Sequence, residues 1–176
     1  MKLYDAPACP FCARVRIALE EKGLEVETVE IDLQNRPAWI YDLNATGRVP
    51  VLDDDGFVLP ESAVIMEYLE ERHPDPPLLP AEAAARARAR LAVFRFDNLL
   101  GDDYYAFRRG DENALVERLR AFDPPVYGFA AIAYLPWLIR VRDVLRLELP
   151  QRLEEWLAAL AERPAVREEL DIVAAS

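Results

Sequence analysis

Cys9 and Cys12 are the only cysteines of the chain and enclose the sequence CPFC. They follow a short apolar strand at residues 2–4 and open a run, residues 11–22, in which apolar residues recur at helical spacing. This places Cys9 at the N-cap of a helix and Pro10 at its first position, where the missing N–H of proline costs nothing. A thiol there faces unpaired backbone N–H groups and the positive end of the helix dipole, which both favour the thiolate. We therefore expect Cys9 to be a nucleophile.

Cys12 lies three residues further on, on the same side of the predicted helix. Once Cys9 has reacted with a disulfide, Cys12 can close a second disulfide with it, which is thiol–disulfide exchange. Three other roles remain open. A zinc site needs four ligands, and beyond the two thiols the chain offers one histidine, His73, which we assign to a linker. A fixed structural disulfide belongs to an oxidising compartment, and two inert thiols can pack in a core. We favour the redox role and expect no metal.

The elements that follow predict a βαβαββα series. Residues 26–31 alternate β-branched and polar side chains, as in a strand buried on one face, and a strand that follows a helix in this way is parallel to the first. A short helix is expected from Pro37 to about Asn44. Residues 47–52 enter a third strand, and the acidic turn 53–56 leads into a fourth.

The next helix opens at Glu61 and Ser62, with Ser62 as its N-cap, and ends near Arg72. Its inward positions are Ile65, Tyr68 and Leu69. Prolines at 74, 76, 77 and 80 then exclude regular structure. We expect a first domain at residues 1–73, a proline-rich linker at 74–80 and an all-helical domain at 81–176.

Helices are expected throughout the second domain. Residues 81–105 predict one long helix with Leu91, Phe94 and Asn98 along one side, and residues 111–122 predict another. Residues 128–147 are the most apolar and predict the central buried helix. A further helix starts at Pro150 and carries Leu153, Trp156, Leu157 and Leu160, and only a short turn is expected after Pro164.

Composition restricts the partners. The formal charge of −11 over 176 residues repels a phosphate backbone, so direct nucleic-acid binding is not expected. The longest stretch without charged residues, 124–139, contains proline and glycine and is too short to span a membrane. We expect a soluble, cytoplasmic protein that does not bind membranes.

Taken together, the CPFC motif, the strand entry Val49-Pro50-Val51-Leu52, the helix start Glu61-Ser62 and the helical second half resemble the glutathione transferase superfamily. Residues 31–39 are most similar to its omega class. Residues 61–80 also resemble stringent starvation protein A, a polymerase-associated member of the same fold. The resemblance implies a thioredoxin-like domain followed by an all-helical domain.

The resemblance also implies a glutathione site. In it the peptide bond before Pro50 is cis, which turns the backbone of Val49 outward to pair with an extended thiol peptide as an added strand would. Ser62 offers a backbone N–H and a hydroxyl to the γ-glutamyl carboxylate, and Glu61 takes the ammonium. The implied contacts are Cys9 at the glutathione sulfur, Phe11 in the same site, Arg36 near the glycyl end, Val49 and Pro50 at the cysteinyl main chain, and Glu61 and Ser62 at the γ-glutamyl group.

Each of these residues also has an ordinary structural explanation. Ser62 can be only a cap, Pro50 an edge-strand proline, Arg36 a solvated charge, and Glu61 a favourable charge at a helix start. Four aromatic residues of the second half could line a pocket for a second substrate, although aromatic residues on helices are more often core. They are Tyr104, Tyr105, Tyr127 and Trp137.

Two departures from the family pattern bear on activity. The Ser-x-x-Asp box that commonly opens the buried helix of the second domain is replaced by Gly128 and Ala131, and that domain is short. Both departures weigh against a second-substrate pocket of the family type. Omega-type sites usually have a single cysteine, whereas Cys12 gives this site the two cysteines of glutaredoxins. Such a site can reduce a disulfide by a dithiol route and a glutathione mixed disulfide by a monothiol route.

These observations predict a glutathione transferase-like thiol oxidoreductase that uses Cys9 as nucleophile and glutathione, or another small thiol of the host, as cosubstrate. The alternative is a non-catalytic regulator that contacts RNA polymerase, as the resemblance to stringent starvation protein A implies. A third activity, conjugation of glutathione to electrophiles, is less favoured because the second domain is short. A homodimer is implied by the resemblance alone.

Overall fold

A four-stranded mixed sheet forms the centre of the first part of the chain in the computed structural model, which describes residues 1–111 and 113–175. Strand β1 (Lys2–Asp5) pairs in parallel with β2 (Glu27–Glu30), as expected for two strands joined by a crossover helix. Strands β3 (Val51–Asp54) and β4 (Phe57–Pro60) complete the order β2-β1-β3-β4 with antiparallel pairing. The expected βαβαββα order is confirmed.

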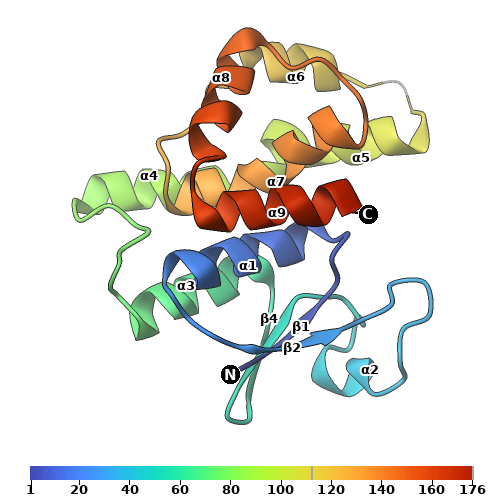
Figure 1. The fold of residues 1–176 in the computed structure, drawn as a ribbon, viewed down its shortest axis with the longest axis vertical. Helices are drawn as coiled ribbons and strands as arrows, with labels where there is room; N and C mark the ends of the chain where they lie inside the picture. Colours follow the sequence, from blue (N-terminus) through green and yellow to red (C-terminus); the bar gives the residue numbers. More distant parts are fainter. Residues whose placement is uncertain (112, 176) are drawn as a thin grey trace. The chain divides into compact units, whose positions relative to one another are not determined.

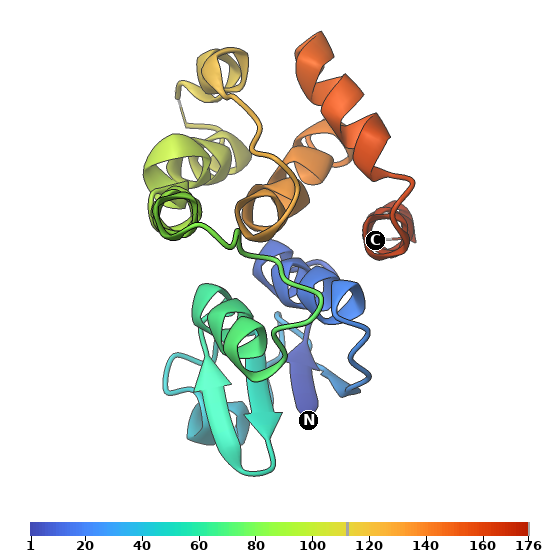
Figure 2. The ribbon, with the colours of Figure 1, turned by 90° about the vertical axis from the view of Figure 1, so that its left-hand side faces the viewer.

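Three helices accompany the sheet: α1 (Pro10–Glu21), α2 (Ile40–Leu43) and α3 (Ser62–Arg72). Figures 1 and 2 show α1 and α3 side by side on one face of the sheet, while α2 lies away from them. The hairpin between β3 and β4 turns at Asp55 and Gly56, whose φ angles of 52° and 94° are those of a turn that matches the twist of the strands.

Three expectations for this part are corrected. Strand β2 is at the edge of the sheet and mostly exposed, so it is not buried on one face. Helix α2 is a single turn that begins at Ile40 instead of Pro37. Glu61, with a φ of 73°, is the N-cap of α3, and Ser62 is the first helical residue.

The chain divides into two compact units, Met1–Leu78 and Leu79–Ala174. The second is helical and includes α4 (Ala83–Phe94), the π-helical segment η1 (Asp97–Gly101), α5 (Asp102–Arg109), α6 (Leu115–Ala121), α7 (Phe129–Asp143), α8 (Gln151–Leu160) and α9 (Pro164–Ala175). Helix α7 is buried from Phe129 to Val141 and lies beside α4 (Figure 2), which confirms it as the central helix of this unit.

The helix expected over 81–105 is interrupted. A π-helical turn adds a residue to the helical repeat and shifts the side chains that follow it. Phe94 is exposed, whereas Phe96 is buried with its ring centroid 4.3 Å from that of Trp137. The next helix starts at Leu115 instead of 111, and residue 112 of that expected helix lies outside the described residues. The last segment is a helix of 12 residues, not a short turn.

Within the described residues, none of the helices has the length and apolar character needed to cross a membrane.

A buried ion pair connects elements of the first unit. The ammonium of Lys22, at the C-cap of α1, lies 2.7 Å from a carboxylate oxygen of Glu70 on α3. It also donates hydrogen bonds to the carbonyls of His73 and Pro76, at 2.7 and 3.0 Å. Glu70 in turn accepts from the backbone N–H of Leu78. The pair therefore connects α1 to the proline-rich stretch after α3.

We expect Lys22→Met to lower the free energy of unfolding by about 3 kcal/mol, because the carboxylate of Glu70 stays buried without the ammonium charge. Urea denaturation measures this loss. The matched control is Lys2→Met, because Lys2 forms an exposed pair with Glu27, and its loss should be much smaller. Equal losses in the two variants would contradict the assigned role of the buried pair.

Candidate functional site

Cys9 lies where the loop after β1 becomes helix α1. It is the N-cap, with extended backbone angles, and Pro10 is the first helical residue, as the sequence predicts. The backbone N–H of Cys9 donates to the carbonyl of Ala6 at 2.9 Å, and its carbonyl accepts from the N–H of Ala13 at 3.1 Å. These two bonds hold the thiol at the positive end of the helix dipole.

The surroundings of Cys9 stabilise its thiolate. A hydrogen bond from the side chain of Cys12 is the largest cause, and it lowers the pKa of Cys9 to about 7. The backbone N–H groups of Phe11 and Cys12 act in the same direction, while burial opposes them. Cys9 is therefore substantially ionised at neutral pH, when an unperturbed thiol is not.

The two cysteines are not equivalent. Cys12 has no exposed surface, and Cys9 retains 8%. Burial and the neighbouring Cys9 raise the pKa of Cys12 far above its usual range. Both are free thiols in this structure. Cys12 thus acts on Cys9 as a hydrogen-bond donor, and its own sulfur is a poor nucleophile in this conformation.

The Val49–Pro50 peptide bond is cis and lies beside the thiol. In its protonated form, the Sγ atom of Cys9 donates to the carbonyl oxygen of Val49 over 3.8 Å, although the two residues are 40 positions apart. Cys9 and Val49 belong to one buried cluster with Ile31 and Ile40. The loop before β3 is therefore packed directly against the start of α1.

A pocket of about 80 Å³ opens next to this loop. Its lining residues are Phe11, Asn44, Arg48, Val49, Pro50, Glu61 and Ser62. Three segments distant in sequence supply them: the start of α1, the loop between α2 and β3, and the start of α3. Five of these residues are among the candidates from sequence: Phe11, Val49, Pro50, Glu61 and Ser62. Cys9 and Cys12 are not among the lining residues, although Cys9 contacts Val49.

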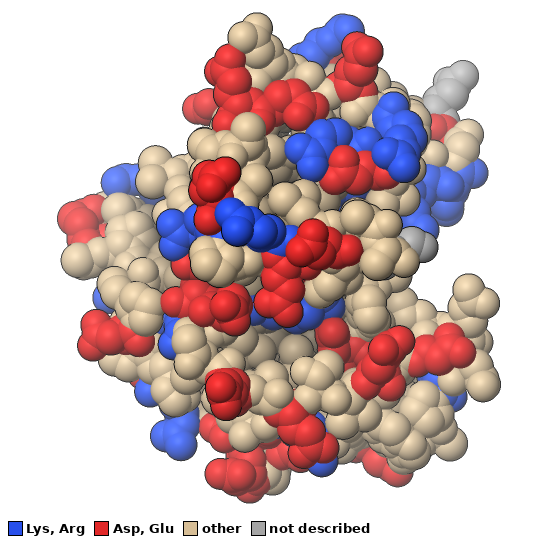
Figure 3. All heavy atoms as spheres, viewed as in Figure 1, with Lys and Arg blue, Asp and Glu red and all other residues tan. Residues whose placement is uncertain are grey.

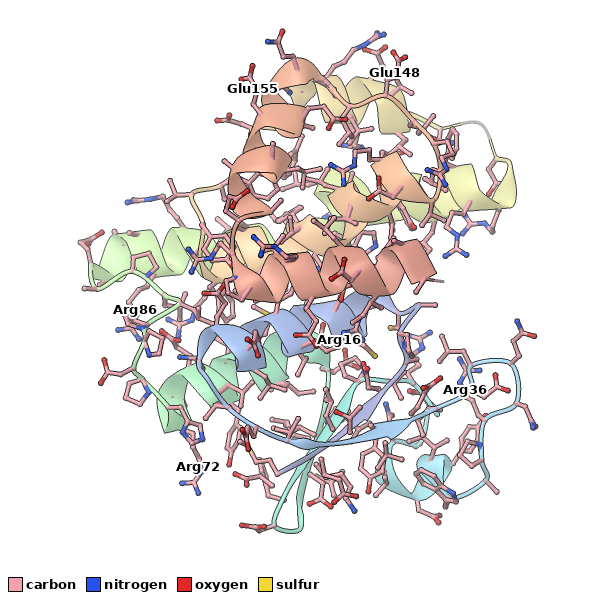
Figure 4. All side chains as sticks on the ribbon, viewed as in Figure 1. Arg16, Arg36, Arg72, Arg86, Glu148 and Glu155 are labelled. Carbon is pink, nitrogen blue, oxygen red and sulfur yellow. The ribbon has the colours of Figure 1, made fainter. Side chains whose placement is uncertain are left out.

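Arg36 does not line this pocket. It lies on the exposed loop between β2 and α2 (Figure 4). The basic lining residue is Arg48 instead, whose carbonyl accepts from the side-chain amide of Asn44 at 2.9 Å. Neither Asn44 nor Arg48 was among the candidates from sequence. The position of Arg48, two residues before Pro50, was the one signal that could have indicated it.

The start of α3 forms one wall of the pocket. Glu61 has a left-handed φ of 73°, which is uncommon for a residue other than glycine. Ser62 is buried at the first helical position, so its backbone N–H belongs to those that a helix leaves unpaired internally. This wall thus carries a carboxylate and a helix N-terminus side by side.

The aromatic candidates of the helical unit differ in burial. Tyr104 and Trp137 are core residues, whereas Tyr105 and Tyr127 are partly exposed. The ring of Tyr127 packs under the guanidinium of Arg163 at 4.1 Å. The N-cap of helix α7 is Gly128, and it provides no side-chain cap, as the missing capping box predicts.

Acidic side chains are scattered over the face drawn in Figure 3, and basic side chains lie among them. No group of three or more His, Cys, Asp or Glu side chains suited to a metal ion occurs in residues 1–111 and 113–175.

Comparison with known proteins identifies the family. The family described as Glutathione S-transferase, N-terminal domain, matches residues 3–77. A probable glutathione transferase of Aplysia californica is 42% identical over 83 residues, which are 47% of this chain and 90% of that protein. The chain belongs to the glutathione transferase superfamily.

Two further similarities are informative. A stringent starvation protein A homologue of Haemophilus influenzae is 37% identical over 132 residues, which are 75% of this chain and 62% of that protein. Glutathione transferase Omega 2C of Trametes versicolor superimposes with a TM-score of 0.81 at 24% identity, covering 99% of this chain and 96% of that one, and this shows the shared fold. The chain spans 46–62% of the length of three stringent starvation protein A homologues that it matches.

The Cys12 hydrogen bond can be tested by alkylation. We expect the rate of iodoacetamide alkylation of Cys9 to rise with pH around a midpoint near 7. In Cys12→Ala the donor is lost, so the midpoint should move to higher pH and the rate below pH 7 should fall several-fold. Cys9→Ala is the control, since the buried Cys12 should then react hardly at all. A parent midpoint near that of free cysteine would contradict a stabilised thiolate.

Proposed function

We propose that this protein is a glutathione-dependent thiol oxidoreductase with Cys9 as its nucleophile. The observation that carries the proposal is a thiolate-stabilising helix start placed directly against the cis Val49–Pro50 bond and its adjoining pocket. Membership of the glutathione transferase superfamily supports glutathione as the thiol.

In the first step, the Cys9 thiolate attacks the glutathione sulfur of a mixed disulfide between glutathione and a second thiol. A bond forms between Cys9 and the glutathione sulfur, and the bond to the second thiol breaks. The second thiol leaves as a thiolate and takes a proton from water. Cys9 suits this attack because a thiol with a pKa near the working pH combines ionisation with nucleophilicity.

In the second step, the thiolate of another glutathione molecule attacks the glutathione sulfur bound to Cys9. Oxidised glutathione forms, and Cys9 leaves as the thiolate that began the cycle. A lowered pKa makes Cys9 a good leaving group as well. Cys12 is buried and hard to ionise, so we assign it to stabilising the Cys9 thiolate and assign resolution to glutathione. This favours the monothiol route over the dithiol route.

Several groups of the pocket suit a γ-glutamyl thiol peptide and support the proposal. The backbone of Val49 can pair with the cysteinyl residue, and Pro50 and Phe11 supply apolar walls. The N-terminus of α3 at Ser62 suits a carboxylate, and Glu61 suits an ammonium. Arg48 lines the same pocket and is the basic residue that we assign to the glycyl carboxylate, in preference to Arg36.

We expect Cys9→Ser to reduce glutathione-dependent reduction of a glutathione mixed disulfide to the uncatalysed rate, because a serine hydroxyl is not ionised at neutral pH. Cys12→Ser should keep most of this activity, since the hydroxyl still donates a hydrogen bond. A spectrophotometric assay coupled to glutathione reductase measures both. Activity of Cys9→Ser equal to that of the parent chain would exclude Cys9 as the nucleophile.

The alternative function is a non-catalytic one, in which the chain contacts RNA polymerase. Its support is the 37% identity to a stringent starvation protein A homologue. The stabilised thiolate is not needed for such a role, so we rank it second. A parent chain without glutathione-dependent activity that captures RNA polymerase subunits from a lysate would favour this alternative.

We also propose that two copies of the chain associate. Large apolar side chains are exposed in both units: Phe57 and Val64 in the first, and Leu91 and Phe94 in the second. Phe94 has 85% of its surface exposed, and such apolar surface on an ordered helix is typical of an interface.

We expect Phe94→Glu to raise the dissociation constant of the dimer at least about tenfold, because a charge replaces an aromatic side chain that the proposed dimer would bury. Sedimentation equilibrium measures this constant. Val126→Glu is the control, since Val126 is 92% exposed in a loop and should not affect association. A parent chain that is monomeric at high concentration would exclude the dimer.

A further inference from the structure

Arg14 lies behind the pocket and contacts two of its lining residues. It is on α1, two residues beyond Cys12, and only 3% of its surface is exposed. One guanidinium nitrogen donates a long hydrogen bond of 3.4 Å to the hydroxyl oxygen of Ser62. The guanidinium carbon lies 5.1 Å from the ring centroid of Phe11, one helical turn away.

The hydrogen bond from Arg14 determines in which direction the hydroxyl of Ser62 can donate. A guanidinium has five donors and no acceptor, so the hydroxyl of Ser62 can only accept from Arg14. Its single O–H is then oriented to donate elsewhere, and Ser62 lines the pocket. Together with the unpaired backbone N–H at the start of α3, this makes two donors at one place, where an anionic acceptor fits and an ammonium does not.

The positive charge of Arg14 also favours an anion near Ser62. A buried cation interacts strongly with an anion a few ångströms away, because little water screens it. Glu61, the residue before Ser62, brings the opposite charge to the same pocket. The pocket is therefore divided into a side that accepts a carboxylate and a side that accepts an ammonium, as the head group of an α-amino acid requires.

We propose that Arg14 is a positioning residue for the α-carboxylate of the γ-glutamyl group, acting through the hydroxyl of Ser62 and the ring of Phe11. This inference rests on the proposed glutathione-dependent function. It adds a buried residue that does not line the pocket and was not among the candidates from sequence.

The test compares two thiols in the parent chain, Arg14→Met and Arg14→Lys. One is glutathione, and the other is the glutathione analogue whose γ-glutamyl α-carboxylate is an uncharged amide. We expect Arg14→Met to raise the KM for glutathione about tenfold, as the loss of a hydrogen-bonded charge implies, with kcat within about twofold. The KM for the amide should be nearly the same in Arg14→Met and in the parent. Arg14→Lys should recover part of the loss for glutathione, because it restores the charge but not the fork geometry.

Arg72→Met is the matched control, because Arg72 is a mostly exposed arginine at the end of α3 and should leave both KM values unchanged (Figure 4). Calorimetric binding of glutathione to the Arg14→Lys variant provides a second measurement if Arg14→Met does not fold. Equal losses for both thiols, or an unchanged KM for glutathione, would overturn this inference and leave the proposed function intact. A parent chain that binds no glutathione would overturn both.

Discussion

The stabilisation of a thiolate at position 9 is the interaction on which the site depends. A helix start supplies part of it through backbone N–H groups, and the S–H of Cys12 supplies the largest part. Burial works against ionisation, so the balance depends on several donors that meet at one sulfur. Within the CPFC motif, Cys12 therefore lowers the pKa of Cys9.

The chemistry of the pocket depends on contacts between distant segments. Val49 reaches Cys9 from the loop before β3, and Ser62 reaches Arg14 from the start of α3. A βαβαββα chain makes such meetings possible because the ends of its central strands and helices converge at one edge of the sheet. The Cys9 thiol therefore lies against Val49, and Val49 and Ser62 line the same pocket.

Each unit contains a buried ion pair between two of its helices. Lys22 and Glu70 join α1 to α3 in the first unit, and Arg140 and Glu169 join α7 to α9 in the second, at 3.0 Å. Each pair also has a hydrogen bond to backbone, Lys22 to the carbonyls of His73 and Pro76 and Arg140 to that of Pro136. Such pairs destabilise strongly when one partner is removed, which favours a single arrangement of the helices.

The sequence alone determined the elements that short-range physics controls. Apolar periodicity placed α1, and the apolar character of residues 128–147 placed α7. The residues Asp55 and Gly56 placed the hairpin, and Pro10 placed Cys9 at a helix N-cap. Each depends on a few neighbouring residues, so the pattern carries the information. The resemblance then assembled Phe11, Val49, Pro50, Glu61 and Ser62 into a candidate site.

Only the tertiary structure decided the rest. The N-cap of α3 moved to Glu61 because its backbone adopts a left-handed angle, and the helix over 81–105 was interrupted by a π-helical turn. Neither change has a local sequence signature. Asn44 and Arg48 line a pocket with residues from two other segments, and Arg14 contacts Ser62 from another helix. Cys12 is a buried donor because the core surrounds it. Burial and proximity are properties of the packed chain, so no pattern along the sequence contains them.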